Sequence, residues 1–189
     1  MTRLVLASAS PRRRQLLEML GIQVEVRPSA VPEVHRPGEA PRDYALRLAH
    51  DKARAVPGHL VLAADTTVVL DGELLEKPVD EDDAVRMLLR LQGRTHDMVT
   101  AVARRAGATV FEAGDVTAVT FRPAREGMLR AYVRTGEPMD KAGAYGIQGY
   151  GAALVERIDG DFFGVMGLPI RLVLDLLAEA GFPYEFPKR

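Results

Sequence analysis

The sequence predicts an α/β fold with a mixed β-sheet flanked by helices. Segments with strand character alternate with segments of helical spacing along the 189 residues, which is typical of this class. Residues 60–70 form an apolar run of the kind found in central strands covered on both faces. The Asp71-Gly72 dipeptide that follows is a strong hairpin signal, so the same sheet must also hold an antiparallel pair. The length favours a single domain over residues 1–189, with room for two lobes.

The first helix has clear boundary signals. Ser10 is a suitable N-cap, Pro11 suits the first helical position and Gly21 is a natural stop. Asp159-Gly160 marks a turn between two further strands. In order, we expect strands near 3–7 and 22–27 around a helix over 10–20, a helix over 41–56, strands over 60–70 and 73–77, a helix over 80–91, strands over 97–104 and 109–121, a helix over 124–134, a Gly-rich stretch over 136–151, strands over 152–158 and 162–166, and a helix over 168–180.

Composition excludes several classes of protein. The 25 basic and 26 acidic residues give a formal net charge of −1, which is unlike a protein that binds nucleic acid polymers. The absence of cysteine excludes disulfides, thiolate zinc sites and cysteine nucleophiles. Because no run of about 18 apolar residues and no signal-peptide core occurs, we expect a cytoplasmic protein with no membrane partner.

Three arginines, Arg12, Arg13 and Arg14, occupy the first turn of the first predicted helix. Cations are unfavourable there because a helix N-terminus carries positive partial charge and free N–H groups. An anion bound at that end, such as a phosphate chain, would resolve the conflict. Solvated surface arginines, or a salt bridge to a neighbouring carboxylate, would explain the same residues.

One carboxylate interrupts the apolar run over residues 60–70. Asp65 is followed by Thr66 and Thr67, and as a buried charge it must meet a cation, a metal or hydrogen-bond donors. Because perturbed carboxylates gather at functional sites, we favour a functional role for Asp65. A bend stabilised by a local Asp–Thr hydrogen bond is the structural alternative.

Lysine is rare, since arginine outnumbers it by 21 to 4. Lys52 shares the apolar face of its predicted helix, where an ammonium needs a partner unless its stem extends to solvent. Lys77 precedes a proline and is held extended, and Lys141 lies in the Gly-rich stretch. An ammonium does not replace a guanidinium, so these lysines mark sites that arginine would not fit, or they reflect codon drift.

The Gly-rich stretch offers a candidate base-binding residue. Gln148 carries both a donor and an acceptor, which match the imide edge of a pyrimidine. Gly143, Gly146 and Gly149 would allow the backbone to approach a ligand closely, or they form an ordinary tight loop. Tyr145 either stacks on a ligand or packs in the core.

Glu33 stands in the loop after the second predicted strand. A solvated surface charge is the simpler explanation. Together with Asp65, however, it could hold an oxygen-preferring ion such as Mg²⁺ or Mn²⁺.

Several motifs together resemble the Maf family of nucleoside triphosphate pyrophosphatases, also described as septum-formation inhibitor proteins. They are LASASPRRRQLL at 6–17, AADT at 63–66, EKP at 76–78, MDKAGAYGIQG at 139–149 and DGDFFGVMGLP at 159–169. The DKAGAYGIQG form is similar to the dTTP/UTP-preferring branch. The resemblance implies an elongated α/β structure with a mixed sheet and a central cleft between two lobes, related in shape to inosine triphosphatases.

The resemblance also implies roles for individual residues. Asp65 matches the family's proposed proton acceptor, and Glu33 and Asp65 would bind a divalent metal cation, Mg²⁺ or Mn²⁺. Arg12, Thr66 and Gln148 match positions linked to substrate preference. Substrate binding is thereby implied for Ser8, Arg12, Arg13, Lys52, Thr66, Lys77 and Gln148.

The implied function is hydrolysis of nucleoside triphosphates, dTTP and UTP above all, to a monophosphate and pyrophosphate, by a cytoplasmic homodimer. The alternative is a nucleotide-binding regulator of cell division or septum formation without essential catalysis. A third option is a house-cleaning enzyme for modified pyrimidine nucleotides. Gln148 would pair with many 5-substituted uracils alike, so the sequence does not rank modified against normal bases.

Overall fold

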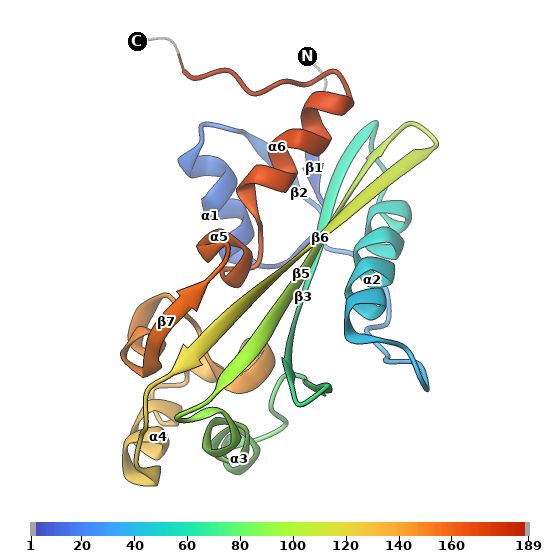
Figure 1. Ribbon diagram of the computed structural model, residues 1–189. Coiled ribbons are helices and arrows are strands. Elements are labelled where there is room, and N and C mark those ends of the chain that lie inside the picture. Colours follow the sequence, from blue (N-terminus) through green and yellow to red (C-terminus); the bar gives the residue numbers. More distant parts are fainter. Residues whose placement is uncertain (1–2, 188–189) are drawn as a thin grey trace. The chain divides into compact units, whose positions relative to one another are not determined.

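A mixed sheet organises the chain in the computed structural model, which describes residues 3–187 and shows seven strands there (Figure 1). The strands are β1 (Leu4–Leu6), β2 (Val24–Val26), β3 (Leu60–Leu70), β4 (Glu73–Leu75), β5 (Thr95–Ala106), β6 (Thr109–Phe121) and β7 (Val155–Asp159). Their order is β2-β1-β3-β5-β6-β7, and β4 pairs with β3. β1 runs parallel to β2 and β3, whereas the β3–β4 and β6–β7 pairs are antiparallel. The predicted α/β class with a mixed sheet is therefore confirmed.

Helices and short 3₁₀ segments complete the secondary structure. The helices are α1 (Pro11–Met19), α2 (Pro41–Ala55), α3 (Glu81–Leu91), α4 (Glu126–Val133), α5 (Phe162–Val165) and α6 (Ile170–Glu179). The Gly-rich stretch contains η1 (Glu137–Asp140), η2 (Ala142–Ala144) and η3 (Gly149–Leu154). Among residues 3–187, no helix combines the length and the apolar character needed to span a membrane.

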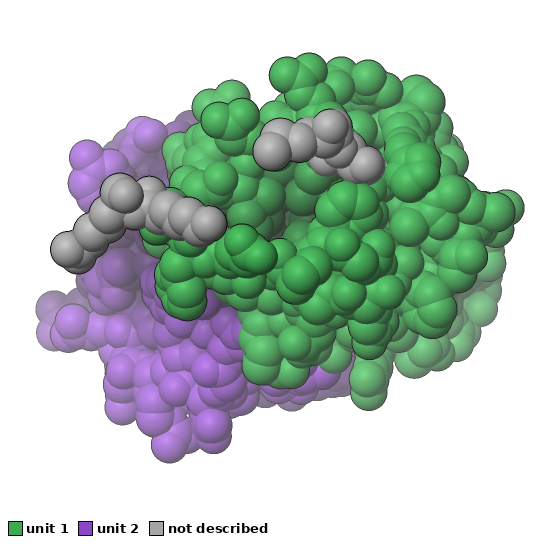
Figure 2. All heavy atoms as spheres, turned by 90° about the horizontal axis from the view of Figure 1, so that it is seen from above, with its two compact units in different colours: residues 1–65, 100–115, 167–189 green, residues 66–99, 116–166 purple. Residues whose placement is uncertain are grey.

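The chain divides into two compact units, which Figure 2 shows in different colours. Unit 1 comprises residues 1–65, 100–115 and 167–189, and unit 2 comprises residues 66–99 and 116–166. Strands β3, β5 and β6 each contribute residues to both units. The single domain over residues 1–189 and the cleft between two lobes stay predictions.

Helices cover both faces of the strands in unit 1. Figure 1 shows α1 and α6 on one side of the strands and α2 on the other. Leu4 of β1 lies in register with Val24 on one neighbour and Leu60 on the other, and all three residues of β1 are buried. This burial on both faces is typical of parallel strands between helical layers.

The predicted start of the first helix and the predicted hairpin turn both occur, but the Ser10 side chain does not cap the helix. Helix α1 begins at Pro11 after Ser10, but the Ser10 side chain makes no capping hydrogen bond; its N–H donates to Ser8 Oγ at 3.2 Å. Asp71 and Gly72 have φ values of 54° and 81°, and they join β3 to the antiparallel β4. Two successive left-handed residues match the right-handed twist of a hairpin, which explains the Asp-Gly pair.

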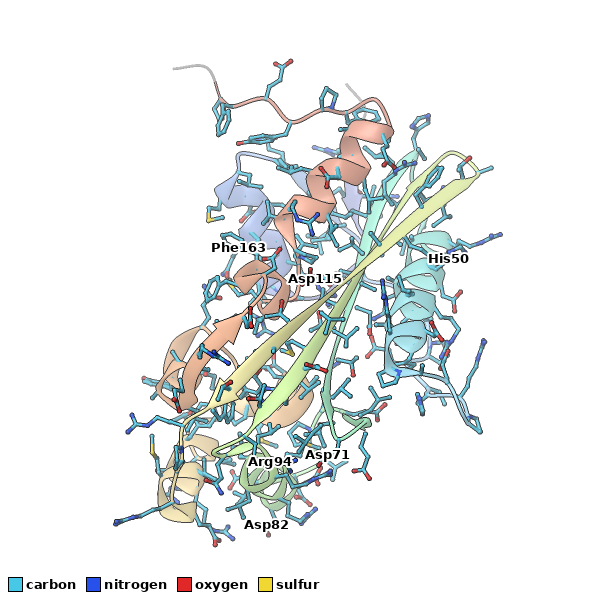
Figure 3. The ribbon with its side chains drawn as sticks, viewed as in Figure 1. His50, Asp71, Asp82, Arg94, Asp115 and Phe163 are labelled. Atoms are coloured by element: carbon cyan, nitrogen blue, oxygen red, sulfur yellow. The ribbon has the colours of Figure 1, made fainter. Side chains whose placement is uncertain are left out.

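The strand predicted over residues 162–166 is wrong. The structure forms the short helix α5 there, with Phe163 labelled in Figure 3. Asp161 caps this helix, because its Oδ1 accepts N–H hydrogen bonds from Phe163 at 2.8 Å and from Gly164 at 3.1 Å. A short apolar run fits either a strand or a helix, and the capping aspartate decides between them.

Three aromatic rings pack edge to face in the core of unit 2. The Tyr145 ring centroid lies 4.7 Å from that of Phe121 and 5.3 Å from that of His96. His96 Nε2 and the Tyr145 hydroxyl share a hydrogen bond of 2.8 Å, while Nδ1 is buried with no hydrogen-bond partner among the described residues. Burial lowers the pKa of His96 to about 4. Tyr145 therefore packs in the core and does not stack on a ligand.

We expect His96 to make the free energy of unfolding depend on pH. Its pKa is lowered on folding, so its contribution is fully present above pH 6.5, the ordinary value, and is lost as the pH falls from there towards about 4. Between pH 7.5 and pH 5 this group alone should remove about 2 kcal/mol of stability. Urea denaturation at the two pH values measures the difference. His96→Gln, which cannot titrate, should show a smaller decrease by that amount, and an equal decrease would contradict the assignment.

Candidate active site

Lys52 lies between two carboxylates in unit 1. Helix α2 places it on the face that also buries Leu48, and Lys52 is only 6% exposed. Its Nζ donates to Asp65 Oδ1 at 2.7 Å and to Glu33 Oε1 at 2.5 Å. The ammonium is buried and paired, so the alternative in which its stem extends to solvent is wrong.

Asp65 is buried in the middle of β3. It is 6% exposed, and burial raises its pKa, because the opposing charges of Lys52 and Arg13 do not fully compensate and the Glu33 carboxylate adds repulsion. A carboxylate with a raised pKa accepts a proton more readily, which is what a general base requires. β3 continues without interruption through Asp65 and Thr66, so the alternative of a local bend is wrong.

Arg13 joins three segments of unit 1 through two backbone carbonyls and one side-chain hydroxyl. Its Nε donates to the Gly167 carbonyl at 2.8 Å, and its Nη1 donates to the Ala64 carbonyl at 2.8 Å and to Ser8 Oγ at 3.0 Å. Burial lowers the pKa of the guanidinium, and the charge of Asp65 opposes that change. Because Ala64 immediately precedes Asp65, Arg13 fixes the backbone beside the buried carboxylate.

The three arginines of the predicted anion site have different surroundings. Arg14 forms a salt bridge with Glu18 at 3.3 Å, which is one of the alternatives that the sequence left open. Arg13 uses its guanidinium within unit 1. Arg12 is half-buried, and its side chain forms no hydrogen bond or ion pair within residues 3–187. Arg12 is therefore the guanidinium of the three that can turn to an anion without breaking a contact.

Arg47 on α2 organises the loop that carries Glu33. Its Nε and Nη2 donate to the two oxygens of Glu39 at 2.6 Å and 2.7 Å, and Nη2 also donates to the Val34 carbonyl at 3.0 Å. The hydrogen bonds from Arg47 lower the pKa of Glu39 to about 2. Val34 follows Glu33 directly, so this contact limits where Glu33 can lie. Sequence reasoning missed Arg47, because nothing in the residue pattern pairs it with this loop.

The remaining predicted site residues belong to unit 2. Thr66 follows Asp65 in β3 and is half-buried, whereas Lys77 and Gln148 are exposed. Gln148 directly precedes η3. The predicted residues thus fall into two sets: Ser8, Arg12, Arg13, Glu33, Lys52 and Asp65 in unit 1, and Thr66, Lys77 and Gln148 in unit 2.

The two carboxylates predicted to bind a metal converge on one positive charge, the Lys52 ammonium. Mg²⁺ commonly binds one or two carboxylates together with substrate phosphates and water. No group of three or more His, Asp or Glu side chains that could hold a metal occurs in the part of the chain from residue 3 to residue 187. Glu33 and Asp65 converge on one point and offer the carboxylate oxygens that Mg²⁺ takes together with phosphate and water, so the two residues fit such a cation.

The sequence profile of the Maf family, described as Maf-like protein, matches residues 3–180. A protein of Anaeromyxobacter dehalogenans (strain 2CP-1), named dTTP/UTP pyrophosphatase, is 54% identical over 190 residues, which cover 98% of each chain. Proteins of the same name from Geobacter sulfurreducens and Koribacter versatilis are 50% and 48% identical, covering 95% and 94% of this chain and 97% and 94% of theirs.

One solved structure shows a distant likeness. The Ham1 protein of Staphylococcus aureus aligns with a TM-score of 0.49 and 14% identity over 81% of this chain and 79% of that chain.

Arg13→Lys should destabilise the protein more than Arg12→Lys. A lysine ammonium cannot reproduce the contacts to Gly167, Ala64 and Ser8, so we expect a loss of about 2–3 kcal/mol for Arg13→Lys. Arg12→Lys should cost less than about 0.5 kcal/mol, as a substitution that breaks no side-chain contact does. Urea denaturation of both variants measures the difference, and equal losses would refute the tethering role of Arg13.

Proposed function

Because this chain belongs to the Maf family, we propose that it hydrolyses dTTP and UTP between the α- and β-phosphates, releasing a nucleoside monophosphate and pyrophosphate. Relatives that are 48–54% identical over nearly their full length carry the name dTTP/UTP pyrophosphatase. The structural observation that carries the chemistry is Asp65 of the AADT motif at 63–66. Asp65 is buried, and it is paired with Lys52.

Asp65 orients and deprotonates the attacking water. Burial raises its pKa, which moves the carboxylate towards the range in which a general base works at neutral pH. Lys52 holds Asp65 Oδ1 at 2.7 Å and so limits rotation of the carboxylate. The water would lose its proton to Asp65 as its oxygen attacks the α-phosphorus, and pyrophosphate would leave.

Positive side chains hold the triphosphate and offset the negative charge that builds up in the transition state. We assign this role to Arg12, Lys52 and Lys77, with Ser8 as a polar neighbour. Arg13 contributes charge too, but its hydrogen bonds to Ala64 and Gly167 make it chiefly a positioning residue.

Glu33 and Asp65 are the residues that would bind a divalent metal cation, Mg²⁺ or Mn²⁺. Such a cation would supply Lewis-acid polarisation of the phosphate. Lys52 keeps both carboxylates turned towards one positive charge, and Arg47 holds the loop beside Glu33. The protein thus holds the carboxylate oxygens of Glu33 and Asp65 close to one point, where a cation would bind.

Gln148 recognises the base, and Thr66 shapes the pocket beside it. The Gln148 amide offers a donor and an acceptor to the imide edge that uracil and thymine share. The 5-position lies outside that edge, so UTP, dTTP and 5-substituted analogues are recognised alike. Modified pyrimidine nucleotides therefore fall within the proposed substrate class.

We further propose a cytoplasmic homodimer that binds neither membranes nor nucleic acid polymers. Two-fold symmetric dimers are the commonest oligomers, and the formal net charge of −1 gives no general attraction to a polyanion. The alternative of a non-catalytic regulator of cell division is not favoured, because the relatives carry the name of an enzyme.

Incubation with UTP or dTTP and Mg²⁺ should yield the monophosphate and pyrophosphate, and Asp65→Asn should lower kcat by about 10²–10⁴-fold, because the amide cannot accept the proton. Chromatography of the products and a pyrophosphate assay measure both. Asp71→Asn is the matched control and should leave kcat unchanged. Asp71 lies in the turn between β3 and β4 and pairs with Arg94 (Figure 3), and an Asn-Gly sequence forms the same turn.

Other outcomes have distinct meanings. A diphosphate and orthophosphate would show cleavage at the γ-phosphate. Nucleotide binding without turnover would favour the regulator. An Asp65→Asn variant as fast as the wild-type protein would remove Asp65 from the reaction.

Chelation with EDTA should abolish turnover, and added Mg²⁺ or Mn²⁺ should restore it. Glu33→Gln should raise the Mg²⁺ concentration for half-maximal activity by about 10–100-fold, because it removes one charged ligand. Glu18→Gln, which removes a surface carboxylate paired with Arg14, is the control and should leave that concentration unchanged. The metal assignment fails if Glu33→Gln and Glu18→Gln have the same Mg²⁺ requirement.

A further inference from the structure

The Glu137 carboxylate organises the backbone that follows Gln148. Its Oε1 accepts the Tyr132 hydroxyl and the Gly151 N–H, each at 2.9 Å, and its Oε2 accepts the Tyr150 N–H at 2.8 Å. Burial opposes ionisation of Glu137, but these three hydrogen bonds outweigh it and lower the pKa. Glu137 is therefore a fixed anion inside a segment that the sequence marks only by its glycines.

Two glycines are required by this carboxylate and its neighbours. Gly149 has a φ of 87°, and a Cβ there would overlap Oε2 of Glu137. A Cβ on Gly151 would overlap the Gly146 carbonyl and the Tyr132 hydroxyl. The sequence suggested that Gly149 lets the backbone approach a ligand. In the structure, side-chain and backbone atoms of unit 2 lie beside both Gly149 and Gly151.

The backbone before Gln148 is held as well. The Gly146 N–H donates to the Tyr132 hydroxyl at 3.1 Å, so one hydroxyl joins Gly146 to Glu137. The Lys141 stem lies against Gly146, where a Cβ would come within 2.9 Å of Cε, and its Nζ donates to the Glu137 carbonyl and to Asp140. Gln148 itself is exposed between these two fixed ends.

We propose that Glu137 is a positioning residue for base recognition, which orients Gln148 by clamping the backbone at Tyr150 and Gly151. This inference rests on the proposed function, since it needs Gln148 to read the base. A rigid amide presents its donor and acceptor to the imide edge at low entropic cost, whereas a mobile one must be ordered by each substrate. The hydrogen bonds of Glu137 thus affect the selectivity between bases and do not affect the reaction at the phosphates.

Glu137→Gln is the decisive variant. A neutral amide keeps one acceptor but turns an NH₂ group towards backbone N–H donors, so part of the clamp is lost. We expect kcat/KM for UTP to fall about tenfold through KM, with kcat for UTP and kcat/KM for CTP unchanged, so that the UTP/CTP ratio falls about tenfold. Glu126→Gln, which removes an exposed carboxylate paired with Arg130 in the same unit, should leave the ratio unchanged.

A binding measurement separates this proposal from the proposed function. Calorimetry with non-hydrolysable α,β-imido analogues of UTP and CTP should show the same tenfold loss of selectivity in Glu137→Gln, whether or not the protein hydrolyses UTP. Tyr132→Phe, which keeps the ring and removes the hydroxyl, should lower the ratio too. The double variant should lose less than the two single losses multiplied together, because both residues act through one clamp.

An unchanged UTP/CTP ratio in Glu137→Gln, with either readout, would overturn the proposal. If the ratio is unchanged because UTP and CTP lose equally, Glu137 only stabilises the fold. If wild-type protein binds the UTP analogue selectively but hydrolyses nothing, the proposed function fails while the positioning role stands.

Discussion

The buried ion pair between Lys52 and Asp65 is the contact on which the unit 1 site depends. Both residues are 6% exposed, and 2.7 Å separates Lys52 Nζ from Asp65 Oδ1. Removing Lys52 would leave the Asp65 carboxylate buried without its hydrogen-bonded cation, which is far more costly than never having had the pair. The other groups are arranged around it: Glu33 gives the ammonium a second acceptor, and Arg13 fixes the backbone before Asp65.

Arginine and lysine have different tasks in this chain. Arg13 and Arg47 use the planar guanidinium to bind several acceptors at once and so hold loops in place. Lys52 and Lys141 place a compact ammonium between close oxygen atoms, at Asp65 and Glu33 in one case and at Asp140 and Glu137 in the other. In each place a single Nζ atom bonds to two oxygen atoms, as a compact ammonium with three donors can.

Conflicts between residue type and surroundings were the most informative signals in the sequence. Asp65 in an apolar strand and Lys52 on an apolar helix face each predict a buried charge with a partner, and each turns out to be the other's partner. The pairing itself depends on how α2 packs against β3, which local pattern does not contain. Arg47 and Glu137 were missed for a related reason, because they bind backbone groups, and a backbone group has no identity in the sequence. Residues 162–166 are predicted as a strand because an apolar run alone fits a strand or a helix. The hydrogen bonds that Asp161 accepts cap α5 and decide for the helix.

The contact between Glu137 and Gly149 has an evolutionary consequence. Any side chain at position 149 would meet the carboxylate, and the φ of 87° would strain its backbone as well. Shortening residue 137 would remove the first constraint and leave the second. Glycine should therefore persist at position 149 among descendants of this chain even where position 137 has changed.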